Sequence, residues 1–151
     1  MSISTIWNTV KTMYPDYIIF VKIGKFYTVY NQDAYIISYK LKYRLKIEES
    51  NYIRYSCGFS DIALNKVRTK MEENKINYLI LDRRNNYEED AKYNNGNLNK
   101  YNEILEKSKR YANNIIRLDK INNYFIENIN KEETRKILIQ LEKKIDEGRK
   151  I

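Results

Sequence analysis

The sequence predicts an α/β domain with a mixed β-sheet flanked by helices, followed by an all-helical C-terminal tail. Runs of β-branched and aromatic residues alternate with helical patterns over residues 1–84, which is typical of a mixed sheet with helices on its faces. Residues 85–97 are polar and without a period, and we interpret them as a linker. Apolar residues then follow 3,4 spacing over residues 98–151, which predicts two or three amphipathic helices.

The first half of the predicted domain contains two helices and two strands. Residues 4–13 place apolar side chains at helical spacing and are followed by Pro15, which ends the helix. Residues 17–23 and 25–30 are β-branched and aromatic, and Gly24 between them predicts a tight turn or bulge. Asn31, a residue type that favours helix caps, is expected to start a short helix.

The segment 39–47 alternates with period two and is predicted to form a strand, although its first residues could instead complete the preceding helix. Its polar positions are all cationic: Lys40, Lys42, Arg44 and Lys46. Such a row is either the solvated face of an edge strand, where lysines prevent aggregation, or a phosphate-binding stripe.

The second half of the domain continues with a strand, a helix and a strand. Residues 52–59 form the expected strand, and Ser60 is the expected cap of a helix at 61–74, with Ile62, Val67 and Met71 on its apolar face. A strand of buried type at 76–84 ends in two arginines.

The composition excludes several classes of enzyme and of binding site. The 151 residues include no histidine and one cysteine, so neither a zinc cluster nor a Cys-His nucleophile can form, and the four isolated glycines build no phosphate-binding loop. We therefore expect a protein that is not an enzyme and that needs no cofactor. No long apolar run or signal segment is present, so we expect a cytoplasmic protein and no membrane partner.

The net charge favours an anionic partner. The chain carries +8 overall, with 14 Lys and Arg against 8 Asp and Glu in residues 1–84, and 14 against 12 in residues 85–151. The excess therefore lies mainly in the predicted α/β domain. A positive field raises the local concentration of phosphates and speeds encounter.

The stretch "FVKIGKFYTVYNQDA" resembles the N-terminal mismatch-recognition domain of the MutS family, in which a strand ending in glycine leads to a Gly-x-Phe-Tyr-Glu segment. The matching positions are Phe20, Gly24, Phe26, Tyr27, Asp33 and Ala34. "CGFSDIALNKVRTKMEENKINYLIL" is similar in layout to a later segment, helix and strand of that family, so the resemblance covers about residues 1–84. The ATPase, clamp and connector parts of a complete MutS have no counterpart in this sequence. The helical tail, in turn, has no counterpart in the family.

The resemblance implies a non-enzymatic DNA-binding module. In the family the phenylalanine enters the minor groove and stacks on a mispaired or unpaired base, and the glutamate hydrogen-bonds that base. Phe26 matches this wedge and Tyr27 would support it, but Thr28 replaces the glutamate and Lys25 replaces the usual aspartate. We therefore expect duplex DNA, mismatched or distorted, as the partner, with weakened mismatch discrimination. The candidate phosphate contacts are Lys22, Lys25, Lys40, Lys42, Arg44 and Lys46.

Other interpretations remain open from the sequence. Phe26 can be an ordinary core or hairpin aromatic, in which case the domain would have lost DNA binding and act as a protein–protein adaptor. The apolar stripes of the tail can form a homodimer or hold a protein partner. Three carboxylates, Asp16, Asp33 and Asp82, could in principle bind a divalent metal as in a nuclease, but a turn, a helix start and a strand end explain them more simply.

Overall fold

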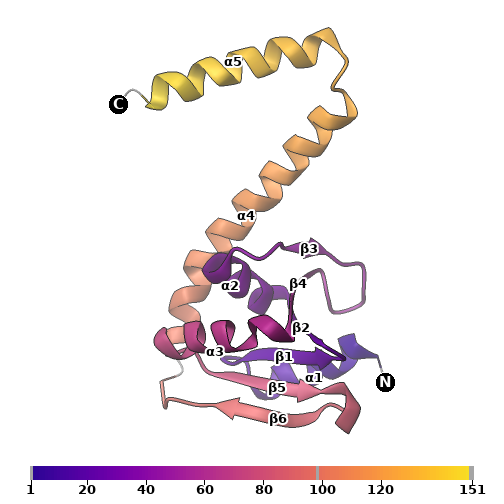
Figure 1. The fold of residues 1–151 in the computed structure, drawn as a ribbon, viewed down its shortest axis with the longest axis vertical. Helices are drawn as coiled ribbons and strands as arrows, with labels where there is room; N and C mark the ends of the chain where they lie inside the picture. Colours follow the sequence, from indigo (N-terminus) through magenta and orange to yellow (C-terminus); the bar gives the residue numbers. More distant parts are fainter. Residues whose placement is uncertain (1, 98, 150–151) are drawn as a thin grey trace. The chain divides into compact units, whose positions relative to one another are not determined.

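The computed structural model describes residues 2–97 and 99–149, which divide into two compact units, Met1–Ala112 and Asn113–Ile151. The first unit contains a six-stranded mixed sheet in the order β3-β4-β2-β1-β5-β6, flanked by helices (Figure 1). The predicted fold class is therefore confirmed. The strands are β1 (Ile18–Ile23), β2 (Phe26–Tyr30), β3 (Lys46–Ile47), β4 (Tyr55–Ser60), β5 (Tyr78–Asp82) and β6 (Glu88–Tyr93).

The centre of the sheet is formed by β1 and β5, which run parallel, and by β2, which pairs antiparallel with β1. All five residues of β5 are buried, as are the first four of β1. Strands covered on both faces need continuous apolar runs, and this is why "IIFV" and "YLIL" occupy these positions.

Helix α1 (Ile3–Met13) covers one face of the sheet, and helices α2 (Asn31–Leu41) and α3 (Leu64–Glu73) cover the other. Trp7 of α1 belongs to a core cluster with Ile19, Val21 and Leu79. Strand residues alternate between faces, so Phe20 and Tyr78 point to the opposite side. There Arg68 of α3 donates a hydrogen bond to the Tyr78 hydroxyl at 2.9 Å.

The predicted strand at 39–47 is wrong over most of its length. Helix α2 continues to Leu41, Lys42 ends it with a left-handed backbone at φ +61°, and β3 comprises only Lys46–Ile47. The amide of Lys42 and the hydroxyl of Ser38 secure this helix end, donating to Ser38 O and to Tyr43 O. The cations at 40, 42, 44 and 46 therefore do not form a row on one strand, because two of them belong to a helix end.

The predicted linker at 85–97 is wrong for residues 88–93, which form β6 and pair antiparallel with β5. The strand lies at the edge of the sheet and is mostly exposed, so polar side chains are tolerated and backbone hydrogen bonds hold it. Tyr93 stacks on Tyr78 with ring centroids 5.5 Å apart. Because such a strand has no apolar alternation, its sequence resembles a linker.

Helix α2 begins at Asn31, as predicted, but two smaller expectations fail. The Asn31 side chain does not cap this helix: with φ +50° the residue accepts hydrogen bonds from the amides of Arg54 and Tyr55 and donates one to Tyr52 O, and so holds the chain that enters β4. Ile62 is not on the buried face of its helix. It lies in the short 3-10 helix η1 (Asp61–Ala63) with 91% of its surface exposed, whereas Val67 and Met71 of α3 are buried.

The first half of helix α4 (Asn99–Glu127) belongs to the first compact unit. Its Tyr101 donates a 2.6 Å hydrogen bond to Asp33 at the start of α2, and its Tyr111 contacts Tyr39 near the end of α2, with ring centroids 5.5 Å apart. The two helices therefore run side by side in the same direction. Ser108 and Ala112 are fully buried, and their small side chains allow close packing.

The second unit contains the end of α4 and helix α5 (Glu132–Arg149). The buried Thr134, in the first turn of α5, donates its hydroxyl hydrogen at 2.7 Å to Asn128 O in the connection between the two helices. The described part of the tail thus forms two helices, where the apolar spacing predicts two or three. None of the helices among the described residues combines the length and the apolar character needed to cross a membrane.

Candidate nucleic-acid interface

The hairpin between β1 and β2 places Phe26 at one end of the sheet. Ile23 and Phe26 are paired across it, so the turn consists of Gly24 and Lys25, and Gly24 adopts the left-handed value φ +62° that two-residue hairpins favour at this position. The carbonyl of Lys25 accepts a 2.8 Å hydrogen bond from the amide of Asp61. The turn is therefore fixed to the chain that leaves β4.

Phe26 and Tyr27 point to opposite faces of the sheet and differ sharply in burial. Phe26 is 61% exposed, whereas Tyr27 is 4% exposed and stacks on Phe59 with centroids 5.5 Å apart and an interplanar angle of 10°. The strand alternation explains the difference. A buried tyrosine thus fixes the backbone that presents an exposed phenylalanine.

Thr28 lies on the same sheet face as Phe26, two residues along β2. In the neighbouring β4, Ser60 is opposite Phe26 and Gly58 is opposite Thr28. A Cβ atom on Gly58 would lie 3.3 Å from Tyr27 O and 3.6 Å from the Thr28 hydroxyl oxygen. Glycine therefore leaves the space beside the Thr28 side chain free of a neighbouring side chain. Thr28 itself is half-buried on this face.

A shallow groove of about 420 Å³ continues along this face toward the N-terminus of α1. Thr28, Gly58 and Tyr30 line it with Lys46 and Glu48. Burial raises the pKa of the Tyr30 hydroxyl to about 12, with a further contribution from the charge of Glu48, so this hydroxyl stays protonated and can donate at neutral pH. Lys46 is the one member of the predicted cationic row found here among the described lining residues.

The end of the sheet near Phe26 carries further cations. Lys25 is exposed in the turn, and the pairing of Lys22 with Asp82 places the exposed Arg83 and Arg84, directly after β5, at this same end. The carboxylate of Asp82 accepts a 2.9 Å hydrogen bond from the amide of Arg84 and so orders the short helix η2 (Arg83–Asn85).

This arginine pair is recognisable in the sequence as a strand ending, but it is absent from the predicted site residues. The position of these arginines near Phe26 follows from the parallel pairing of β1 with β5, which brings the ends of two distant segments together.

The other predicted cations lie elsewhere. Lys22 points to the face opposite Phe26, where its ammonium is 5.9 Å from the centre of the Tyr27 ring. Lys40 and Lys42 lie at the end of α2, on that opposite side, and Arg44 is exposed in the connection to β3. Lys25 therefore lies at the end of the sheet that carries Phe26, and Lys46 lies on the same face as Phe26. Lys40 and Lys42 lie on the opposite side.

The three carboxylates considered for a metal are not gathered in one place. Asp16 accepts a hydrogen bond from Asn102, Asp82 accepts one from Arg84, and Asp33 is fully buried in contact with Lys11, Tyr101 and the amide of Ile19. Each is occupied by its own protein partner. No group of three or more potential metal ligands occurs among the described residues.

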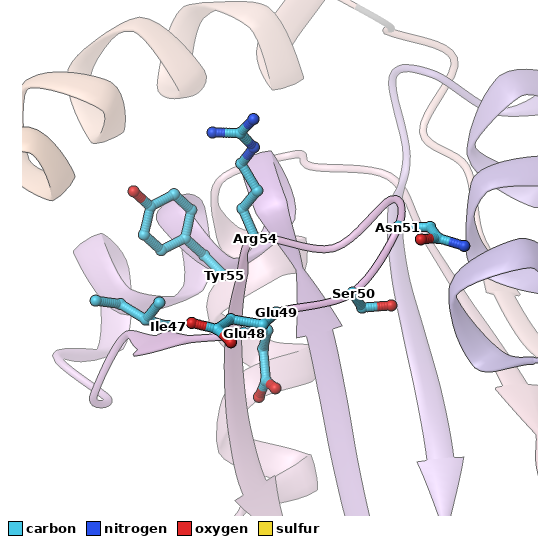
Figure 2. Close-up of a pocket in the computed structure, with 7 residues that line it drawn as sticks. All are labelled: Ile47, Glu48, Glu49, Ser50, Asn51, Arg54 and Tyr55. Atoms are coloured by element: carbon cyan, nitrogen blue, oxygen red, sulfur yellow. The ribbon is translucent and has the colours of Figure 1, made fainter.

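A hollow of about 500 Å³ lies in the loop between β3 and β4, and its lining comes from that one connection (Figure 2). The lining contains two carboxylates, Glu48 and Glu49, and one guanidinium, Arg54. The carboxylate of Glu48 accepts a 2.7 Å hydrogen bond from Ser56. Its acidic lining does not suit a phosphate, and we assign no nucleic-acid contact to it.

A comparison with known protein families gives a match over most of the first unit. The model of the MutS domain I family matches residues 2–92. This chain belongs to the MutS domain I family. The match extends beyond residue 84 into β6, and it includes the hairpin, Phe26 and the β4 face beside it. Among curated proteins, none matches the chain.

MutS domain I is a mismatch-recognition domain without catalytic machinery, so the α/β part of this protein is a recognition domain of that type. Helix α4 begins after the end of the match. Its first half is nevertheless part of the same compact unit as the sheet. The family domain therefore carries an additional packed helix in this protein.

Proposed function

We propose that this protein binds duplex DNA and inserts Phe26 at a step weakened by a mismatched or unpaired base. The supporting observation is the 61% exposure of the Phe26 ring, which is presented by a hairpin end and anchored by the buried Tyr27. A largely exposed aromatic ring contributes little to the packing of the folded unit, but it can replace the stacking that a damaged step has lost.

The cations at the hairpin end are suited to the phosphates on either side of the wedge. Lys25 is in the turn itself, and Arg83 and Arg84 follow β5 at the same end of the sheet. Insertion of an apolar wedge kinks the duplex, and the bend brings its backbone to flanking basic residues. If these three cations each contact one phosphate, they contribute about −2.7 to the slope of log K against log salt, at roughly −0.9 per contact.

Thr28 limits how well the wedge distinguishes mismatches. It lies on the same face as Phe26, where the family's glutamate would approach the base, but its hydroxyl is shorter and uncharged. The hydroxyl supplies one hydrogen bond without repelling phosphates. We therefore infer a preference for deformable steps with only a modest selection among the bases at that step.

The experiment is a fluorescence-anisotropy titration of wild-type protein and Phe26→Ala against perfect, mismatched and bulged duplexes at two salt concentrations. Met13→Ala is the matched control, because Met13 is 63% exposed but lies at the C-terminal end of α1. Loss of one ring–base stack costs about 1–3 kcal/mol, which corresponds to a roughly 5- to 150-fold weaker complex with the mismatched or bulged duplex.

The outcomes separate three cases. A preference for distorted duplexes that disappears in Phe26→Ala and persists in Met13→Ala supports the wedge. Salt-dependent binding that is equal in all three proteins contradicts the wedge and leaves only backbone binding. No binding by the wild-type protein at low salt contradicts DNA binding itself and favours the adaptor function.

A second candidate function is association through the second unit, and its exposed aliphatic side chains favour it. Those exposed by more than 40% are Leu118, Ile121, Ile126, Ile129, Ile137, Ile139, Leu141 and Ile145. Such a number of exposed aliphatic side chains on two helices favours an interaction with another protein surface. Residues 113–149 carry 8 Lys and Arg against 7 Asp and Glu, a near balance of charge that suits another copy of the same helices better than DNA.

This association is tested by light scattering across a concentration series. We expect the wild-type mass to rise toward twice that of one chain and Leu141→Glu to reduce it. Gln140→Glu, which adds the same charge at an exposed neighbouring position, should behave like wild type. A monomeric wild-type protein at all concentrations would contradict self-association.

A further inference from the structure

Lysines from three helices converge on the side of the first unit opposite Phe26. Lys40 is at the end of α2, Lys70 is in the last turn of α3, and Lys107 is in the first half of α4. Lys40 and Lys107 line the same hollow together with Asn74, and the Asn74 side chain donates a 2.7 Å hydrogen bond to the carbonyl of Lys70. The positive charges of Lys70, Lys107 and Lys42 all act on Lys40. We call these four residues the lysine cluster.

The cluster is not neutralised by the protein. Among the described residues, none of its four lysines forms an ion pair, and the neighbouring Lys100–Glu103 pair at 3.3 Å is exposed. Burial and the three neighbouring charges lower the pKa of Lys40. Like charges held together raise the free energy of the empty protein, and an anion bound among them removes that repulsion.

The surface at the cluster is shaped to receive a small anionic group. A hollow of about 200 Å³ lies between α2 and α4, lined by Lys40, Lys100, Lys107, Asn74, Glu103 and Ile104. One carboxylate, that of Glu103, is present there and is paired with Lys100. The remaining lining supplies ammonium and amide donors, which suit a phosphate.

Aromatic rings border the cluster on one side. The Lys42 ammonium lies 4.3 Å from the centre of the Tyr111 ring and 5.0 Å from that of Tyr39, and the two rings contact each other. Both tyrosines are half-buried, so each has an edge open to solvent. Cations interleaved with aromatic rings are typical of surfaces that bind nucleic-acid strands through phosphates and base stacking.

We propose that the lysine cluster is a second nucleic-acid site, which binds backbone phosphates on the side of the sheet opposite Phe26. The site goes beyond the proposed wedge and does not depend on it. Lys40 and Lys70 come from the family domain, whereas Lys107 and Tyr111 come from a helix outside the match to residues 2–92. The added helix thus completes a binding surface that the family domain alone does not have.

The first test is the salt dependence of duplex binding by the variant Lys40→Gln/Lys70→Gln/Lys107→Gln. If each lysine contacts one phosphate, the slope of log K against log salt becomes shallower by about 2.7, at roughly 0.9 per contact. The control Lys120→Gln/Lys143→Gln/Lys144→Gln removes the same charge from exposed positions of the second unit and should leave the slope unchanged. A slope that is the same in the cluster variant and in the control overturns the proposal.

The second test locates the contact in the wild-type protein by lysine acetylation and mass spectrometry, with and without a saturating duplex. We expect acetylation of Lys40, Lys70 and Lys107 to decrease together, in wild type and equally in Phe26→Ala. Protection confined to Lys25 and Lys46 would overturn the second site while supporting the hairpin face. Protection of the cluster without any effect of Phe26→Ala on mismatch preference would instead refute the wedge and retain the second site.

Discussion

The substitution Asp33→Asn tests the buried ion pair that fastens the added helix to the family domain. The carboxylate of Asp33 is fully buried; one oxygen accepts from Lys11 at 2.7 Å and from Tyr101 at 2.6 Å, and the other accepts from the Ile19 amide at 3.0 Å. An amide NH₂ in place of one oxygen would face the Lys11 ammonium, and in place of the other it would face the Ile19 amide; neither group can accept a hydrogen bond. Lys11, only 12% exposed, would also lose its counter-charge.

Breaking a buried pair in this way costs about 3–5 kcal/mol of the free energy of unfolding. Tyr101→Phe removes the hydrogen bond that the hydroxyl donates to Asp33 and the 3.0 Å bond that it accepts from Lys11, but leaves the ion pair in place, and should cost about 1.5–3 kcal/mol. Glu103→Gln breaks an exposed pair on the same helix and should change stability by less than about 1 kcal/mol. The expected order of the three variants follows from the burial of each group and from the number of hydrogen bonds that each substitution breaks.

The assay is urea unfolding followed by the fluorescence of Trp7, the single tryptophan. Trp7 is 3% exposed in the core between α1 and the sheet, so it reports the first unit, whereas circular dichroism also records the helices of the second unit. Destabilisation of Asp33→Asn by less than about 1 kcal/mol, or by no more than Glu103→Gln, would refute the view that this carboxylate holds the sheet, α1 and α4 together.

Three further predictions concern Thr28, the buried thiol of Cys57 and the buried hydroxyl of Tyr30. Thr28→Glu should weaken binding to a perfect duplex, because it adds a negative charge near phosphates, and should raise the ratio of mismatched to perfect affinity in anisotropy; a ratio no higher than that of Thr28→Gln would contradict this role. The Cys57 thiol, fully buried with its pKa raised by burial to about 12, should react with iodoacetamide at pH 8 only after unfolding, and labelling of the native protein at the rate of a free thiol would contradict this burial. Because Cys57 and Tyr30 bind their protons more tightly when folded, the free energy of unfolding should fall as pH rises from about 10 to 12, by about 1.4 kcal/mol per pH unit for each group; Cys57→Ala should show a correspondingly shallower decline in urea titrations.

The sequence predicts the centre of this fold better than its edges. Strands β1, β2 and β5 are buried, and burial imposes apolar and β-branched residues that can be recognised one segment at a time. Strand β6 is held by backbone pairing at an edge and needs no apolar pattern, so residues 88–93 resemble a linker. At 39–47 the alternation of lysines with apolar residues resembles a strand, but Tyr39 and Leu41 complete a helix whose packing on the sheet overrides that local preference.

The candidate site shows the same division. The opposite burial of Phe26 and Tyr27 follows from strand alternation and a turn glycine, both of which the sequence contains. The approach of Arg83 to the hairpin depends on the parallel register of β1 and β5, which joins segments about 60 residues apart and leaves no local pattern. The convergence of Lys40, Lys70 and Lys107 depends on three separate helices, and the sequence alone gives no indication of it.

Helix α4 connects stability with the proposed binding. Its Tyr101 reaches the buried Asp33, and one to three turns later Lys107 and Tyr111 lie beside Lys40 and Tyr39. The buried contact is specific and charged, and it fixes the helix in rotation and register, which is the best-attested use of a buried polar network. Tyr101→Phe should therefore weaken the protection of Lys107 by nucleic acid more than that of Lys25, because the helix loses its register while the hairpin face keeps its own supports.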